Sequence, residues 1–177
     1  METNNLNPNY TFDNYSIEDE NRFLLEAALC VAQGNELGKS YNPLYIFGEK
    51  GAGKTHLLNA IGNYIFEKDK FKNILYIDSI DFVKELKLAL KNNEYETFIR
   101  KYENLDVLLL DDIQFLANEE KAEQVFIYLF DKLHREKGKT IVISADKVSK
   151  KIKGLNQRIN NRCDIGLVTD IRKFEDC

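Results

Sequence analysis

The sequence predicts an α/β fold in which a mostly parallel sheet carries helices on both faces. Short apolar runs suited to strands alternate along the chain with longer segments of helical periodicity. One of these runs, residues 107–110, is apolar at every position, as expected for a central strand that is buried on both faces. A glycine-rich segment at 48–55 directly follows the apolar run Leu44–Phe47, in the order of a strand, a tight loop and a helix. In such a fold the ligand crevice lies at the carboxyl ends of the strands.

The individual elements follow from apolar spacing and from the residues that end helices. Gly34 ends the first predicted helix, and Gly138 ends the longest one. The predicted helices cover residues 19–33, 53–68, 80–91, 95–103, 119–137 and 155–161. The predicted strands cover residues 44–47, 74–77, 107–110, 140–144 and 165–168.

The chain is expected to form a single domain. At 177 residues it is long enough for one α/β core and too short for two sizeable ones. Residues 1–18, which are rich in Asn, are expected to form an extended arm, and residues 19–177 the core. With 44% hydrophobic and 31% charged residues, the composition is that of a globular protein and excludes a disordered or fibrous one.

Charge, cysteines and hydropathy narrow the function further. The net charge of −4 means that any nucleic-acid contact must come from a local surface and not from a global field. Cys30, Cys163 and Cys177 show no C-x-x-C spacing, so we expect free thiols and no zinc site. No apolar stretch approaches membrane-spanning length and the first residues lack a signal-peptide pattern, so a cytoplasmic location without a membrane span is expected.

Residues 48–55 fit G-x-x-x-x-G-K-[ST] at every fixed position and predict a phosphate-binding loop. The glycines Gly48, Gly51 and Gly53 let the backbone curl so that successive N–H groups point at a phosphate, and the following helix adds the positive end of its dipole. Lys54 is placed to bridge β- and γ-phosphate oxygens, and Thr55 offers a hydroxyl to Mg²⁺. The alternative is a glycine-rich turn that matches by chance.

An acid pair closes the most apolar run of the chain. Asp111 and Asp112 stand at the carboxyl end of the predicted central strand, at the edge where the phosphate loop is also expected. Asp111 is suited to hold magnesium, and Asp112 to orient or deprotonate the water that attacks a γ-phosphate. The alternative is that the pair caps the following helix.

Two further groups are candidates for contacts with the γ-phosphate. Asp146, with Ser144 as second choice, follows the strand at 140–144 at the same edge, although a turn-forming Asp explains the position nearly as well. Arg158 and Arg162 lie four residues apart on a predicted helix and share a face. A solvated basic face is the default interpretation, and an arginine that reaches a neighbouring subunit's nucleotide is the alternative.

Together these motifs resemble those of the AAA+ ATPases, and within them the family of the bacterial replication initiator DnaA. Strings narrower than general ATPase motifs carry the likeness, which covers almost the whole chain. They lie at residues 6–15, 21–23, 41–44, 51–58, 110–116 and 141–146. The resemblance implies a P-loop NTPase fold of the AAA+ type and an ATP-controlled switch that hydrolyses Mg-ATP slowly.

The resemblance also implies partners and further site residues. The ATP-bound chain would self-associate as a filament on origin DNA, contact single-stranded DNA and help to open the duplex, with the replicative helicase as a further partner. Arg162 falls where the family's arginine finger sits, Asp146 is the first sensor, and Val83 falls where the family touches single-stranded DNA. The remaining nucleotide-binding positions would be Ala52 and His56 in the loop, and Asn21 with the arm around residues 12–17 in the adenine pocket.

Departures from the family pattern leave other functions open. The sequence stops at Cys177, about where the family's helical lid begins, so the lid and the helix-turn-helix DNA-binding domain are expected to be missing. Cys163 and Ile165 stand where the family usually carries aromatic residues. The alternative function is a DnaA-like regulator or helicase-loader ATPase that acts through protein partners. A small-molecule phosphoryl transferase is disfavoured because no arginine-rich lid segment is present.

Overall fold

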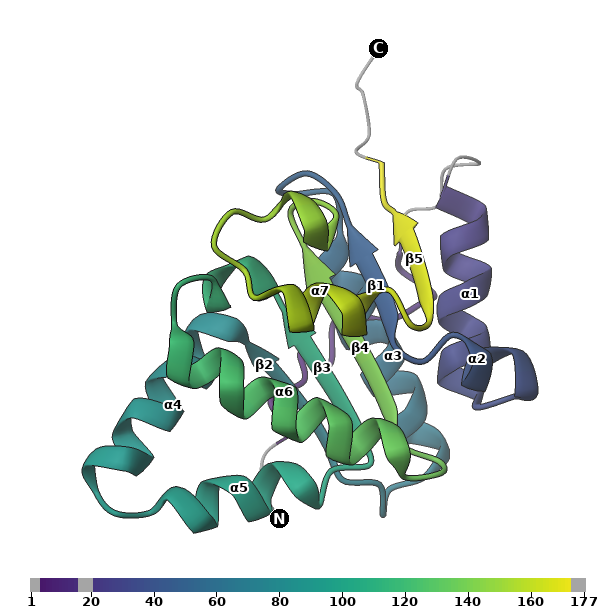
Figure 1. Cartoon of the computed structure of the whole chain (residues 1–177). Coiled ribbons are helices and arrows are strands. Elements are labelled where there is room, and N and C mark those ends of the chain that lie inside the picture. Colours follow the sequence, from purple (N-terminus) through teal and green to yellow (C-terminus); the bar gives the residue numbers. More distant parts are fainter. Residues whose placement is uncertain (1–3, 16–20, 173–177) are drawn as a thin grey trace.

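Within the residues that the structure describes, 4–15 and 21–172, the computed structural model has one sheet of five strands in the order β2-β3-β4-β1-β5 (Figure 1). The strands are β1 (Leu44–Phe47), β2 (Ile74–Asp78), β3 (Val107–Asp111), β4 (Thr140–Ala145) and β5 (Leu167–Asp170). All of these strands pair in parallel, which confirms the predicted sheet. Predictions for residues 1–3, 16–20 and 173–177, Cys177 among them, lie outside the described residues.

Two of the described helices precede β1, and the others connect successive strands. They are α1 (Arg22–Gln33), α2 (Glu36–Ser40), α3 (Lys54–Lys68), α4 (Ser79–Lys91), α5 (Tyr95–Glu103), α6 (Glu120–Arg135) and α7 (Gln157–Cys163), with the 3₁₀ segments η2 (Ile113–Leu116) and η3 (Ser149–Lys151). The sequence analysis missed α2, η2 and η3, because each is too short to show a periodic pattern. It also placed α7 and β5 too early. Asn156 caps α7 by accepting a hydrogen bond from the Arg158 N–H at 2.9 Å, so this helix begins only after Asn156.

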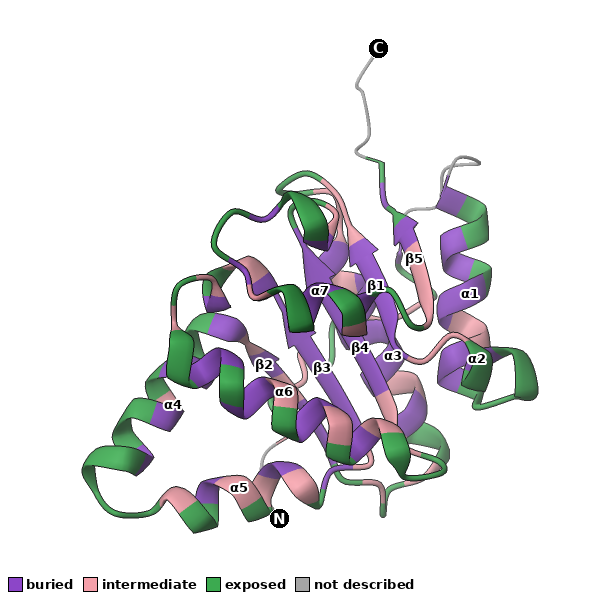
Figure 2. Cartoon of the chain, in the orientation of Figure 1, coloured by how far each residue is buried: buried purple, intermediate pink, exposed green. Residues whose placement is uncertain are grey.

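The two faces of the sheet bury separate layers of side chains. In β3, Leu108 and Leu110 pack with residues of α4, α5 and α6, whereas Val107 and Leu109 pack with residues of α1 and α3. This division follows from the alternating direction of side chains along a strand. Every residue of β3 is buried (Figure 2), and α4 to α7 lie on the opposite face of the sheet from α3 (Figure 1). The prediction of helices on both faces is therefore confirmed.

The described part of the amino-terminal arm packs along α3. The Asn63 side chain donates hydrogen bonds of 2.8 Å to the carbonyls of both Asn7 and Tyr10. The Asn7 N–H in turn donates to the Asn59 side chain at 2.8 Å. Asn59 and Asn63 both lie on α3. The arm is therefore held by the helix that directly follows the phosphate loop.

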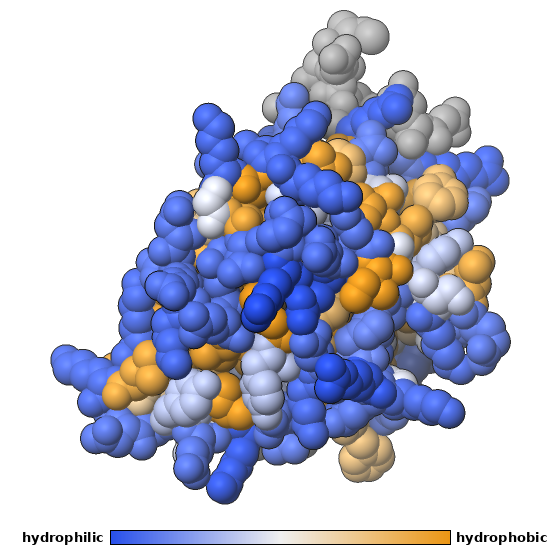
Figure 3. Space-filling view, in the orientation of Figure 1, coloured by the Kyte–Doolittle hydropathy of each residue, from blue (hydrophilic) through white to orange (hydrophobic). Residues whose placement is uncertain are grey.

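The molecular surface is polar where Figure 3 shows it, with apolar side chains in separate areas between hydrophilic ones. Among the placed residues, no helix combines the length and the apolar character needed to cross a membrane.

Leu109→Ala is expected to lower the free energy of unfolding by about 2–5 kcal/mol, because truncation of a large apolar side chain in a close-packed core leaves a cavity. Leu109 is fully buried in the central strand. Leu88→Ala is the matched control, since Leu88 on α4 is 58% exposed and its truncation is expected to change stability by at most about 0.5 kcal/mol. Chemical denaturation of both variants measures the difference, and equal losses would contradict the place of Leu109 in the core.

Candidate nucleotide site

The phosphate loop lies between β1 and α3, at the carboxyl edge of the sheet. Gly51 and Gly53 have φ angles of 84° and 101°, in the left-handed region that glycine adopts without a steric penalty. Gly48 is required for a different reason, the close approach of another backbone segment: a Cβ at this position would lie 2.3 Å from the carbonyl oxygen of Ile171. The glycines of the predicted motif thus each meet a backbone requirement of this fold.

Lys54 lies inside the loop. Its Nζ donates hydrogen bonds to the carbonyls of Gly48 at 2.8 Å and Glu49 at 2.9 Å, and the residue is only 7% exposed. The Ala52 N–H donates to the Glu49 carbonyl at 3.2 Å and closes the turn. Because Lys54 is also the first residue of α3, the ammonium group and the positive end of the helix dipole act at the same place.

Asp111 is the centre of the site. Its Oδ2 accepts a hydrogen bond of 2.6 Å from the Thr55 hydroxyl and one of 2.7 Å from the Tyr76 hydroxyl. Its Oδ1 accepts from the Ser144 hydroxyl, and its backbone carbonyl accepts from the Ser79 hydroxyl at 2.9 Å. Donors from the phosphate loop, β2 and β4 therefore hold one carboxylate at the end of β3. The predicted meeting of the loop and the first acid is observed directly.

Tyr76 is a site residue that sequence reasoning missed. It lies in the middle of β2, and nothing in a run of apolar residues marks its hydroxyl as part of a site. Burial, together with the negative charge of Asp111, raises the pKa of Tyr76 well above its usual range. The hydroxyl therefore stays protonated and remains a donor to the carboxylate at any physiological pH.

Asp112 adopts a strained backbone. Its φ and ψ are both 55°, a left-handed conformation that is uncommon for a residue other than glycine. Its N–H donates to the Ser144 Oγ at 2.9 Å, and its Oδ1 accepts a hydrogen bond of 3.0 Å from the side-chain amide of Gln114. The alternative role as a helix cap is not what the geometry shows, because Asp112 makes no side-chain capping bond to η2.

Asp146 lies at the same edge, but its carboxylate is turned to another partner. The Asp146 Oδ2 is 3.2 Å from the Nζ of Lys147, while the Asp146 N–H donates to the Gln114 Oε1 at 3.2 Å. The second choice, Ser144, is the residue that contacts the acid pair directly. The structure thus brings Asp111, Asp112 and the backbone of Asp146 together.

A third carboxylate accompanies the acid pair. Asp78 ends β2 in register with Asp111 and caps α4 by accepting a hydrogen bond from the Ile80 N–H at 2.7 Å. Burial raises the pKa of Asp78, and the charges of Asp112 and Asp111 add to that effect.

No cluster of three or more His, Cys, Asp or Glu residues suited to a metal is found in the described part of the chain. The ligands that Thr55 and Asp111 offer, a hydroxyl and a carboxylate oxygen, still fit Mg²⁺, which takes its remaining ligands from phosphates and water.

His56 connects the loop to the arm. Its Nε2 lies 2.9 Å from the Thr11 carbonyl and 3.1 Å from the Asn14 Oδ1. Both partners are acceptors, so Nε2 carries the proton. The ring stacks on that of Tyr10, with 4.7 Å between the ring centroids, and meets the ring of Tyr15 edge-on, with 5.1 Å between the centroids. Burial raises the pKa of Tyr15 to about 12. These arm residues cover the start of α3, beside the phosphate loop.

The expected role of Asn21 in an adenine pocket stays a prediction. In the structure, this side chain joins two segments of the backbone. Its Nδ2 donates to the Arg172 carbonyl at 3.0 Å, and its Oδ1 accepts from the Arg172 N–H at 2.9 Å. The residue is 6% exposed. Asn21 therefore fixes the chain that follows β5 against the start of α1. The expected pocket segment covers residues 12–17, and residues 16 and 17 of it lie outside the described ranges.

Arg162 is held within its own chain. Its Nε and Nη2 donate to the two carboxylate oxygens of Asp131 on α6 at 2.7 and 2.6 Å, and its Nη1 donates to the Arg158 carbonyl at 2.8 Å. This is a bidentate pair with a third bond, and the Arg162 side chain is only 19% exposed. Arg158 itself is exposed. The simple expectation of a solvated basic face is therefore wrong for Arg162.

Val83 lies in α4 and is 7% exposed, packed with the apolar residues of the core between α4 and the sheet. Its contact with DNA stays a prediction. The exposed apolar side chains of the same helix are Ile80, Leu88 and Leu90.

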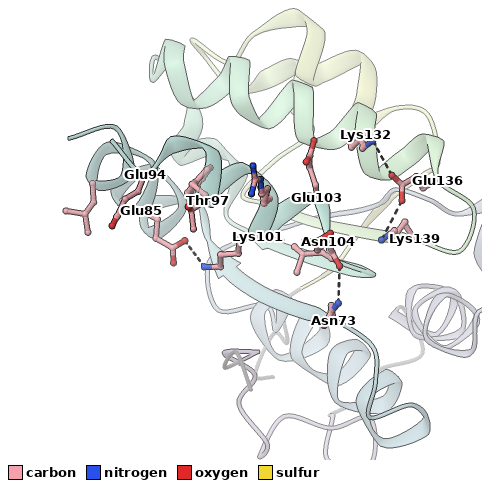
Figure 4. Close-up of a pocket in the computed structure, with 15 residues that line it drawn as sticks. Asn73, Glu85, Glu94, Thr97, Lys101, Glu103, Asn104, Lys132, Glu136 and Lys139 are labelled. Atoms are coloured by element: carbon pink, nitrogen blue, oxygen red, sulfur yellow. Dashed lines mark hydrogen bonds and ion pairs between the residues drawn. The ribbon is translucent and has the colours of Figure 1, made fainter. Parts of the chain in front are cut away.

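A cavity of about 880 Å³ lies away from the phosphate loop, between α5, the end of α6 and the amino ends of β2 to β4 (Figure 4). Five of its charged side chains pair with one another: Lys101 lies 2.9 Å from Glu85, and Glu136 lies 3.6 Å from Lys132 and 3.7 Å from Lys139. These pairs offer a ligand few unpartnered groups.

The Asp131–Arg162 pair predicts a pH dependence of stability. The hydrogen bonds from Arg162 hold the pKa of Asp131 below its ordinary value of 3.8, so the pair stabilises the folded state above that value. The contribution is lost as the pH falls through the lowered pKa. Wild type is expected to exceed Asp131→Asn in unfolding free energy by about 1 kcal/mol at pH 7, and the gap should narrow as the pH falls below 3.8. Urea unfolding at pH 7 and at a series of acidic pH values measures this gap, and a constant gap would contradict the assignment.

Comparisons with known proteins agree with the geometry. A family model described as the bacterial DnaA ATPase domain matches residues 6–170. Domain III of DnaA from Thermotoga maritima is 38% identical, with a TM-score of 0.88 over 94% of this chain and 68% of that one. A DnaA bound to AMPPCP and single-stranded DNA is 34% identical, with a TM-score of 0.87 over 94% of this chain and 51% of that one. This chain thus spans about half the length of that initiator.

The similarity to a helicase loader is weaker. The DnaC helicase loader has a TM-score of 0.78 with 19% identity, over 93% of this chain and 97% of that one. At this identity the likeness shows a shared fold and nothing more. The family match and the nucleotide-site geometry agree on a P-loop fold of the AAA+ type, and the chain belongs to the family of bacterial DnaA ATPase domains.

Proposed function

We propose that this chain is the ATP-binding switch module of a DnaA-type replication initiator, which hydrolyses ATP slowly and self-associates on DNA in its ATP state. The observation that carries the proposal is the 2.6 Å hydrogen bond from Thr55 to Asp111. It places the end of the phosphate loop and the carboxylate of the central strand at one point. A nucleoside triphosphate with its metal ion requires this juxtaposition.

The side chains divide the work of binding and reaction. Lys54 and the N–H groups of the loop bind the β- and γ-phosphates, because the Lys54 ammonium lies inside the loop and the positive end of the α3 dipole lies at its end. Thr55 and Asp111 would hold Mg²⁺, which supplies charge neutralisation of the phosphate oxygens. Asp112 orients the attacking water, and Asp146 at the end of β4 senses the γ-phosphate.

Slow turnover is consistent with how the Asp146 carboxylate is held. This carboxylate is paired with Lys147. It must exchange that partner before it can contact a nucleotide. A switch that retains its nucleotide suits such an arrangement better than a rapid enzyme does.

The proposed partners are further copies of this chain, single-stranded and origin DNA, and the replicative helicase. The similarity to an initiator bound to single-stranded DNA supports a DNA contact, which we place near Val83 on α4. Arg162 is the proposed contact to the nucleotide of a neighbouring copy. Recognition of duplex origin sequences is not proposed for these residues.

The second candidate is a regulator or helicase loader that acts through protein partners. The DnaC helicase loader shares the fold of this chain at 19% identity. Identities of 34–38% to DnaA against 19% to DnaC favour the initiator. Binding assays with single-stranded DNA and with purified helicase distinguish the two: ATP-dependent capture of DNA without helicase supports the first.

Lys54→Ala is expected to weaken ATP binding at least 100-fold, since the loop loses the only ammonium group that the described loop residues direct inward. Lys50→Ala is the control, because Lys50 is an exposed residue of the same loop. Calorimetric titration with Mg-ATP measures both affinities. Unchanged binding by Lys54→Ala would refute the site assignment.

Arg162→Ala is expected to leave nucleotide binding by the monomer intact and to abolish ATP-dependent self-association. Because this change also breaks the tie between α6 and α7, Asp131→Ala is the matched control: it breaks the same pair and keeps the arginine. Analytical ultracentrifugation with and without ATP measures assembly. Equal loss of assembly in both variants would assign Arg162 a purely structural role.

A further inference from the structure

The Gln114 side chain bridges the ends of two strands. Its Nε2 donates to the Asp112 Oδ1 at 3.0 Å after β3, and its Oε1 accepts from the Asp146 N–H at 3.2 Å after β4. The chemistry fixes this orientation of the amide. A carboxylate offers only acceptors and a backbone N–H only a donor, so a flipped amide would lose both bonds.

Gln114 stands on a rigid base. It belongs to η2, whose residues Ile113 and Leu116 are fully buried, and the Phe115 N–H donates to the Asp112 carbonyl at 3.1 Å. The packed turn therefore fixes the backbone of Gln114 next to Asp112, and the two hydrogen bonds orient its amide. A side chain on such a base can hold a neighbouring group in one orientation.

The bridge is not needed to join the two strand ends. Ser144 of β4 already donates to Asp111 and accepts from the Asp112 N–H, and β3 and β4 pair along their length. Those bonds fix the backbone of Asp112 but leave its carboxylate free to rotate about the side-chain torsions. Among the described residues, the amide of Gln114 is what restrains that carboxylate.

We propose that Gln114 is a positioning residue for ATP hydrolysis: its amide N–H aims the Asp112 carboxylate, and its amide carbonyl couples that aim to the end of β4. The inference rests on the proposed function, because it needs a hydrolytic role for Asp112. Any displacement of Asp146 on γ-phosphate binding is transmitted through one amide to the group that orients water. Loss of such a supporting contact typically lowers activity about 10- to 100-fold.

Two substitutions separate the two ends of the bridge. Gln114→Ala removes both bonds, and turnover is expected to fall about 10- to 100-fold while the affinity for Mg-ATP stays within about twofold of wild type. Gln114→Glu keeps an acceptor for the Asp146 N–H and replaces the donor to Asp112 with a second carboxylate. Protonation of that carboxylate restores the donor, so the deficit of Gln114→Glu should shrink as the pH falls from 8 to about 5. The deficit of Gln114→Ala should not.

A double-mutant cycle completes the test. If Gln114 acts through Asp112, adding Gln114→Ala to Asp112→Asn lowers turnover no further. If the losses of turnover from Gln114→Ala and Asp112→Asn add in the double variant, or if Gln114→Ala alone keeps turnover within twofold of wild type, the proposal is overturned. Neither result would contradict the proposed ATPase. If wild type itself binds no ATP by calorimetry, the proposed function fails and this inference falls with it.

Discussion

The structure depends on one carboxylate that several elements share. Asp111 accepts hydrogen bonds from Thr55 of the phosphate loop, Tyr76 of β2 and Ser144 of β4. A buried negative charge is tolerable only when donors surround it, and these hydroxyls provide them. The same bonds set the loop at a fixed place on the edge of the sheet. A small error in strand register would therefore disturb burial of the charge and the geometry of the site together.

The sheet order explains why these donors converge. β3 lies between β2 and β4, and all of these strands run in one direction, so their carboxyl ends meet at a single edge. β1 pairs with β4 on its other side and delivers the phosphate loop to that edge. Residues widely separated in the sequence, such as Thr55 and Asp111, are neighbours for this reason alone.

The sequence was sufficient for the parts of the fold and site that local patterns encode. Apolar periodicity located most helices and strands, and the loop at 48–55 and the acid pair were identified because their chemistry needs fixed spacing. Tyr76, Gln114 and Asp131 were not identified, because their roles arise from contacts with residues about 30 or more positions away, or from a turn of four residues that shows no pattern. Asn21 shows the converse: the resemblance to the DnaA family singled it out, and the folded chain joins it to the backbone of Arg172.

The ion pair between α6 and α7 sets the energetics of any contact made by Arg162. The Arg162 guanidinium uses three of its five N–H donors on Asp131 and on the Arg158 carbonyl, and its charge is already paired with the Asp131 carboxylate. An outside anion therefore competes with Asp131 for that charge, and the free energy of its binding is a difference between two similar ion pairs. Competition of this kind disfavours the binding of free phosphate to Arg162. It favours only a multiply charged acceptor that is held in a fixed geometry. Selectivity is then built into the resting molecule before any neighbour arrives.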